Sequence, residues 1–171
     1  MKKIFVDMDG VLTDFNSGYK QIIGRSPSEV KSSKVKGEYA LCWDKFVDHD
    51  GFEILGWNPG GPDLIAALML LDRKKYQVCI LSSAGGFHRQ LTVMRQKIKW
   101  LEDHMIEFPA VVVPGRRYKT GFADENSLLI DDTFDTTLSF REEGGSAIHH
   151  QQNMDATITA LDIWLNDTTI N

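Results

Sequence analysis

The chain of 171 residues carries 19 Lys and Arg against 24 Asp and Glu, a formal net charge of −5, and 42% of its residues are hydrophobic. These values predict an ordinary globular protein with one compact domain and room for a small insertion. The acidic balance argues against binding to duplex nucleic acid or to an anionic membrane, and no apolar run approaches the ~18 residues of a membrane span. Two cysteines are too few for a disulfide framework, and the N-terminus lacks a signal-peptide pattern, so we expect a cytoplasmic protein.

Short apolar runs, typical of buried strands, alternate along the chain with longer stretches of helical spacing. The predicted strands are residues 3–8, 77–81, 110–113, 128–130 and, more weakly, 146–149. One predicted core helix begins at Pro62, and three more cover residues 87–104, 135–143 and 154–166. Strands separated by helices indicate right-handed βαβ units and a mostly parallel sheet with helices on both faces. The predicted fold is therefore a Rossmann-like α/β/α core with a five-stranded sheet.

Residues 14–61 interrupt this alternation, because they separate the first two strands by far more than one helix. They contain Ser26-Pro27-Ser28-Glu29, a capping box with Pro at the first helical position. A second helix is predicted near residues 38–49. We interpret the stretch as a small helical cap above the carboxyl edge of the sheet, inserted into a core of residues 1–13 and 62–171. The alternative is two surface helices without a functional role.

The strongest chemical signal follows the first predicted strand, where Asp7 and Asp9 stand two residues apart on a turn opened by Gly10. Carboxylates this close disfavour joint ionisation unless a cation or a proton intervenes, and a divalent metal is the simplest remedy. One alternative is a solvated acidic turn. Another is a calcium loop, but this would place Val11 and Gly18 where metal ligands are required. Ligands of open α/β sheets bind at the carboxyl ends of strands, so we expect a site here.

The sequence Asp-Met-Asp-Gly-Val-Leu-Thr-Asp of residues 7–14 resembles motif I of the haloacid dehalogenase (HAD) superfamily. Leu81-Ser82-Ser83 resembles its motif II, Lys119 its motif III lysine, and Leu128-Leu129-Ile130-Asp131-Asp132 its acidic motif IV. Within the superfamily, the resemblance is to the 5'(3')-deoxyribonucleotidases. It rests on residues 7–15, on residues 51–55 with the following Pro-Gly, and on Lys119-Thr120 with motif IV. Motif II departs from that family, because it reads Ser-Ser-Ala-Gly in place of Thr-Ser-Pro.

The resemblance implies a phosphomonoester hydrolase that works through an aspartyl phosphate. Asp7 would be the nucleophile, and Asp9 would be the general acid toward the leaving oxygen and then the general base for water. Mg²⁺ would bind Asp7, the main-chain carbonyl of Asp9 and motif IV. We expect Asp132 to be the direct ligand and Asp131 to stand behind it.

The resemblance also implies which residues hold the substrate. Lys119 and Ser82 would bind phosphoryl oxygens, and Ser83 is the alternative to Ser82. Phe15 and Phe52 would contact a base, and Lys97 would contact phosphate. Further aromatic side chains recur at helical spacing in the insertion, where packing against the core is the alternative role: Tyr39, Trp43 and Phe46.

The preferred substrate is a deoxyribonucleoside monophosphate. The alternatives are another small phosphate ester, such as a sugar phosphate or a nucleic-acid 3' end, and a non-catalytic module that binds nucleotide or phosphate. A homodimer is compatible with the sequence. Asp14 is predicted to cap or orient the motif I loop, and the pair His149-His150 is predicted to be a strand end or a surface pair.

Overall fold

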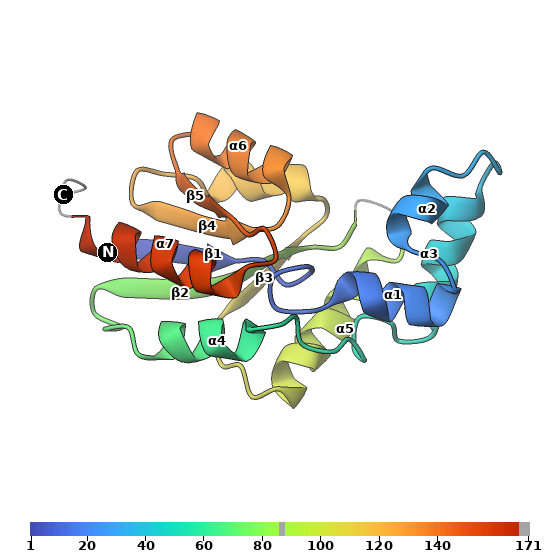
Figure 1. Ribbon diagram of the computed structural model, residues 1–171, viewed down its shortest axis with the longest axis horizontal. Helices are drawn as coiled ribbons and strands as arrows, with labels where there is room; N and C mark the ends of the chain where they lie inside the picture. The colour runs from blue at the N-terminus through green and yellow to red at the C-terminus, as the bar shows by residue number, and fades with distance from the viewer. Residues whose placement is uncertain (86–87, 168–171) are drawn as a thin grey trace.

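The computed structural model describes residues 1–85 and 88–167 and contains one five-stranded sheet flanked by helices (Figure 1). Its elements in chain order are β1 (Lys2–Val6), α1 (Phe15–Ile23), α2 (Pro27–Lys31), α3 (Glu38–Asp48), α4 (Gly61–Met69), β2 (Tyr76–Ser83), α5 (Gln90–Asp103), β3 (Ala110–Val113), the 3-10 helix η1 (Arg116–Phe122), β4 (Ser127–Asp131), α6 (Phe134–Glu142), β5 (Ser146–His149) and α7 (Met154–Asn166). The strand order is β3-β2-β1-β4-β5, and every pairing is parallel. The predicted α/β class and parallel sheet are confirmed.

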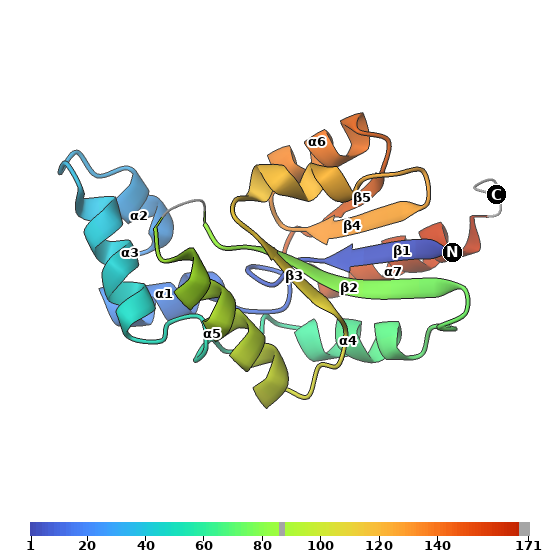
Figure 2. The same cartoon turned by 180° about the vertical axis from the view of Figure 1, so that it is seen from behind.

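The two faces of the sheet carry different hydrophobic clusters, because successive side chains of a strand point to opposite sides. Ile4 and Val6 of β1 belong to the larger cluster, which also contains buried residues of α4, α5 and α7. Phe5 belongs to the smaller cluster, with Phe140 of α6 and Phe122 of η1 packed against it. Figure 2 shows α6 and η1 on one side of the sheet and α4, α5 and α7 on the other. The core is therefore a three-layer α/β/α arrangement.

Three helices, α1 to α3, occupy the predicted insertion and lie beyond the carboxyl ends of the strands (Figure 1). The capping box of α2 forms in both directions between Ser26 and Glu29. Two side chains of α5 hold the insertion against the core. Gln96 donates to the main-chain oxygen of Val47 at 2.7 Å, and the Trp100 indole donates to that of Leu55 at 2.8 Å. Division of the chain into core and cap at residues 13 and 61 stays a prediction.

Two elements differ from the sequence prediction. Helix α1 was not expected, because Asn16, Ser17 and Gly18 in its first turns are weak helix formers. Its start is fixed by Asp14, whose side chain accepts a hydrogen bond from the Ser17 amide, which confirms the predicted capping role. The second element is η1, which was not predicted because a 3-10 helix this short has too few turns to show a periodic pattern of apolar residues. Residue 87, the predicted start of the helix now seen as α5, lies outside the described residues.

The described helices include none with the length and apolar character that crossing a bilayer requires.

Candidate active site

The site lies where β1 and β4 end side by side at the centre of the sheet. Val6 is paired with Ile130, and the Asp7 amide donates to the Ile130 oxygen at 2.9 Å, so Asp7 follows the end of β1 beside Asp131, the last residue of β4. The chain crosses from β1 to β2 on one side, while β4 lies on the other, so the strand order reverses here. Such a reversal leaves a crevice at the strand ends, where α/β proteins bind ligands.

Three carboxylates converge in this crevice. Asp7, Asp131 and Asp132 each offer one oxygen, and these oxygens lie within 4.8 Å of one another. The Lys119 ammonium contacts Asp7 Oδ1 at 2.9 Å and Asp131 Oδ2 at 2.7 Å, and it is 1% exposed. Burial works against the charge of Lys119, but the two carboxylates outweigh it and raise the pKa of this lysine. One lysine against three ionised carboxylates leaves an excess of two negative charges, which suits a divalent cation.

Asp132 is the member of the cluster best placed to bind a metal. Asp131 already uses both oxygens, one on Lys119 and the other on the Thr133 amide at 2.8 Å. Asp132 accepts only a 3.3 Å bond from the Thr133 hydroxyl among the described side chains. Burial and the adjacent carboxylates, Asp7 first, raise the pKa of Asp132 to about 7. Carboxylate oxygens are the ligands that Mg²⁺ prefers, so the donor set fits this ion.

Glycine is required at position 10 for this arrangement. Gly10 has φ +78°, and a Cβ atom there would stand 2.2 Å from Asp132 Oδ2. A side chain at this position would therefore push Asp132 out of the cluster.

Asp9 lies apart from the three clustered carboxylates and has its own lysine. The Lys97 ammonium contacts Asp9 Oδ2 at 2.5 Å and the Ser82 hydroxyl at 2.8 Å. Burial raises the pKa of Asp9, and Asp7 adds to the effect while Lys97 opposes it. Lys97 and Ser82 have no exposed surface. Neither side chain therefore offers surface to a phosphate, because Lys97 binds Asp9 and Ser82, and the Ser82 hydroxyl accepts from Lys97.

Motif II presents its second serine to the pocket. Ser83 lines the cavity, and its hydroxyl accepts from the Gly85 amide at 3.1 Å, whereas Ser82 is buried on the opposite side of β2. Neighbouring side chains on a strand point to opposite sides. Two adjacent serines at a strand end therefore cannot both face the pocket, and sequence alone does not tell which one does.

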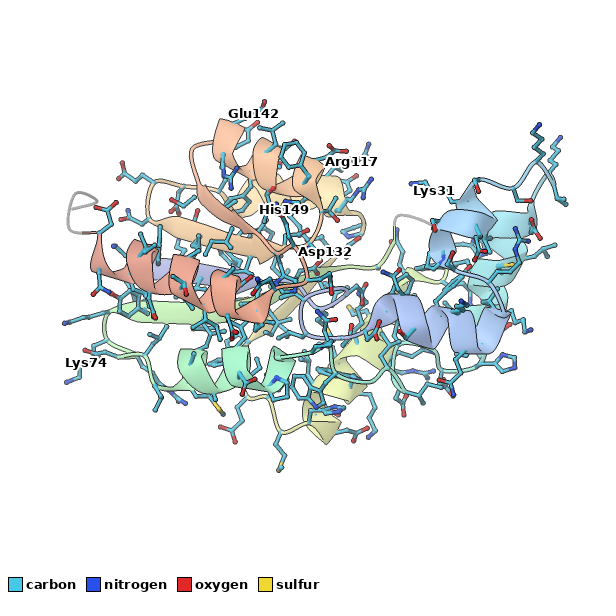
Figure 3. All side chains as sticks on the ribbon, in the orientation of Figure 1. Lys31, Lys74, Arg117, Asp132, Glu142 and His149 are labelled. Carbon is cyan, nitrogen blue, oxygen red and sulfur yellow. The ribbon has the colours of Figure 1, made fainter. Side chains whose placement is uncertain are left out.

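A cavity of about 510 Å³ connects the carboxylates with the insertion. Besides residues already described, its lining includes Phe15, Asn16, Lys31, Tyr39, Trp43, Arg116 and Thr133. Figure 3 shows Lys31 on the insertion, Arg117 on the core, and Asp132 on the part of the core that faces the insertion. Sequence reasoning missed Asn16, Lys31 and Thr133, because no local pattern distinguishes them from other surface residues.

The two predicted base contacts have different positions. Phe15 lines the cavity, whereas Phe52 is 1% exposed and stacks on Phe15 with ring centroids 5.7 Å apart. The Lys97 ammonium also lies over the Phe52 ring, 4.7 Å from the ring centroid. Phe52 is thus a buried support for Phe15 and Lys97, and its ring leaves almost no surface for the expected contact with a base.

A buried polar network braces the motif I turn from behind. The Asn58 amide donates to the Gly10 oxygen at 3.0 Å and approaches His150 Nε2 at 3.3 Å. Because an amide nitrogen only donates, His150 Nε2 accepts and its Nδ1 donates to Thr157 at 2.8 Å. Burial lowers the pKa of His150, which agrees with this neutral form. His149 Nε2 donates to the main-chain oxygen of Asp132 at 3.0 Å. The predicted strand end is confirmed, because β5 ends at His149, whereas the predicted surface position is wrong for His150, which is buried and supports the site.

Neither a protein-family model nor a curated protein sequence matches the chain. Solved structures resemble it at low identity. A haloacid dehalogenase-like family hydrolase from Streptococcus pneumoniae has a TM-score of 0.59 and 17% identity over 87% of this chain and 84% of that chain. A HAD-superfamily hydrolase from Ehrlichia chaffeensis has a TM-score of 0.56 and 12% identity over 97% and 100%. The HAD-hydrolase YfnB from Bacillus subtilis, solved with magnesium, has a TM-score of 0.56 and 15% identity over 94% and 98%.

The likeness to the first two structures covers 87% and 97% of this chain, and it includes the parallel sheet with helices on both faces. Together with the acidic cluster at the strand reversal, this likeness shows that this chain has the fold of the HAD-superfamily hydrolases.

Proposed function

We propose that the protein is a Mg²⁺-dependent phosphatase that hydrolyses small phosphate monoesters through an aspartyl phosphate. The observation that carries the proposal is the environment of Asp7. Its Oδ1 accepts from the Met8 amide at 2.8 Å and contacts Lys119 at 2.9 Å. Its Oδ2 has no hydrogen-bond donor among the described residues, so this oxygen is available to attack phosphorus. Asp7 lines the cavity, where a substrate can reach it.

The chemistry divides between Asp7 and Asp9. The bond between Asp7 Oδ2 and phosphorus forms while the bond from phosphorus to the leaving oxygen breaks. That oxygen keeps the electron pair and takes a proton from Asp9, so an alcohol leaves. Asp9 next accepts a proton from water, whose oxygen attacks phosphorus. The Asp7–phosphorus bond then breaks, which releases inorganic phosphate and restores both carboxyl groups.

The remaining groups of the site manage charge. The Lys119 ammonium lies beside Asp7, where it can bind a phosphoryl oxygen and offset charge in the transition state. Asp7 and Asp132, together with the main-chain oxygen of Asp9, would hold a magnesium ion, which would supply the further positive charge that lets a phosphate dianion approach these carboxylates. Ser83, on the cavity wall, is the motif II hydroxyl available to the substrate.

A nucleoside monophosphate, with deoxyribose preferred from the family resemblance, is the proposed substrate. The cavity of about 510 Å³ falls within the usual range for small-ligand sites, roughly 300–1,000 Å³. Phe15, Tyr39 and Trp43 line it and can stack on a base. Lys31 and Arg116 also line it and favour an anionic ligand.

A phosphate-release screen tests this function. The panel is nucleoside 5'- and 3'-monophosphates, ribo and deoxy, with sugar phosphates, assayed with Mg²⁺ and again with EDTA. We expect release from deoxyribonucleoside monophosphates in Mg²⁺ and none after chelation. Release from sugar phosphates alone would replace the substrate class and leave the phosphatase standing. Nucleotide binding without release from any compound would favour the non-catalytic binding module.

A further inference from the structure

Lys97 is a charged side chain without any exposed surface. Burying an ammonium is costly unless the group is paired and hydrogen-bonded. Lys97 meets this requirement with three partners: Asp9 Oδ2 at 2.5 Å, the Ser82 hydroxyl at 2.8 Å and the Phe52 ring at 4.7 Å from its centroid. Each partner comes from a different part of the chain: the motif I turn, β2 and the insertion. The lysine thus joins the three parts of the molecule that surround the acid/base carboxylate.

The hydrogen-bonding capacity of an ammonium group orients Asp9. Lys97 can only donate, so the Asp9 oxygen that faces it, Oδ2, must accept. A proton carried by Asp9 therefore belongs on Oδ1. The nearest donor to Oδ1 among the described side chains is the Thr13 hydroxyl, at a long 3.5 Å, and this hydroxyl is also 3.2 Å from the Met8 oxygen. Oδ1 is thus left available for a ligand, in a side chain that is 27% exposed and lines the cavity.

We propose that Lys97, seated on Ser82, is a positioning residue that fixes the Asp9 carboxyl so that Oδ1 exchanges the proton with the leaving oxygen and then with water. The inference rests on the proposed phosphatase function and adds to it a role for a lysine that never touches the substrate. In the first step the proton moves from Asp9 Oδ1 to the leaving oxygen, and in the second step water returns one to Oδ1. Lys97 takes no part in either proton transfer.

The dependence of the rate on the leaving group tests the proposal. In Lys97→Met the stem keeps its bulk while the ammonium is lost. A nucleoside 5'-monophosphate needs a proton on its leaving alkoxide, whereas p-nitrophenyl phosphate expels a stable phenolate without one. General acid catalysis contributes roughly 10²–10⁴-fold. We expect kcat/KM to fall about 100-fold for the nucleotide and less than about fivefold for the aryl ester.

The matched control is Lys99→Met, which makes the same change two residues along α5 at an exposed position. We expect unchanged kcat/KM for both substrates. Equal losses of kcat/KM for both substrates in Lys97→Met would overturn the proposal, because a lysine that binds phosphate or merely supports the fold does not distinguish leaving groups. A wild-type protein that releases phosphate from neither of these substrates nor from any sugar phosphate of the panel would instead refute the phosphatase function itself.

A double-mutant cycle provides an independent readout. Once Asp9→Asn has removed the acid, loss of Lys97 has nothing further to misplace. We expect the added Lys97→Met change to lower nucleotide kcat/KM by no more than about twofold in that background. A further loss as large as in the wild type would contradict the proposal.

Ser82→Ala covers the case in which Lys97→Met fails to fold, as judged by circular dichroism. It removes one small hydroxyl and leaves the ion pair of Lys97 with Asp9 in place. We expect kcat/KM to fall about fivefold for the nucleotide and not measurably for the aryl ester, which is the same selectivity as in Lys97→Met with a smaller loss. Equal losses for the two substrates in this variant would also overturn the proposal.

Discussion

Two buried lysines bind the two carboxylates of one turn, and they differ in what else they face. Lys119 pairs with Asp7 and Asp131 on the wall of the cavity. Lys97 pairs with Asp9 from behind, and only protein atoms surround it. A lysine on the wall can give its charge to the substrate, whereas one behind the wall can act only through the carboxylate that it holds. We therefore expect the same residue type to bind phosphate at Lys119 and to position an acid at Lys97.

The largest expected loss of activity comes from replacing Asp7, the carboxylate that Lys119 contacts. Asp7→Asn removes the nucleophile and should lower kcat about 10⁴-fold or more for every substrate. The fold should persist, because an amide can still accept from the Met8 amide. Phosphate release under single-turnover conditions measures the loss, and circular dichroism monitors folding. Wild-type turnover in this variant would exclude Asp7 as the nucleophile.

Lys119→Met sharpens the contrast between the two lysines. Loss of a charge that stabilises the transferring phosphoryl group costs roughly 10²–10³-fold. Because every phosphate ester needs this charge, kcat/KM should fall equally for a nucleotide and for p-nitrophenyl phosphate. A loss confined to the nucleotide would assign Lys119 the role proposed for Lys97 and would break the comparison.

Asp132 makes the stability of the metal-free protein depend on pH. Its pKa rises to about 7 from an ordinary value of 3.8, so the folded state binds its proton more tightly than the unfolded chain does. Stability should therefore be highest below pH 4 with respect to this group and should decline as the pH rises toward 7. The shift of about three units corresponds to at most about 4 kcal/mol.

Thermal unfolding of metal-free protein between pH 4 and 8, compared with Asp132→Asn, measures this contribution. The variant should lose most of the decline, because its amide does not titrate. Mg²⁺ should raise the melting temperature of the wild type more than that of the variant. Identical profiles of melting temperature against pH for the wild type and the variant would show that Asp132 does not cause the pH dependence of stability.

The smallest expected effect compares the stacked pair Phe15 and Phe52. Base stacking on an aromatic side chain is worth about 1–3 kcal/mol, so Phe15→Leu should raise the nucleotide KM about tenfold and leave kcat nearly unchanged. Phe52→Leu, in the core, should lower the melting temperature and disturb Lys97 instead. Equal nucleotide KM values for the wild type and Phe15→Leu would remove the base from the proposed position.

The parallel sheet and the position of the acidic cluster could be predicted because their signals are local. Strands such as β1 and β4 contain short apolar runs with an Asp at the last residue or directly after it, and parallel strands bring such ends to one edge. Helix α1 could not be predicted in this way. Its residues have low helix propensity, and its stability depends on Tyr19, which packs on Phe46 of α3 with ring centroids 5.2 Å apart.

Residue order along the chain was thus enough to place Asp7, Asp131 and Asp132 in one crevice. It was not enough to tell which side chains of Ser82, Ser83, Phe52 and Lys97 reach that crevice. A shift of one residue along a strand places a side chain on the opposite face, in the core and not in the cavity. The packing of one helix can have the same effect. Direction and burial arise from contacts between segments far apart in the chain, as with Lys97 and Asp9, which are 88 residues apart. Only the folded arrangement therefore distinguishes groups that can touch a substrate from those that hold the catalytic groups in place.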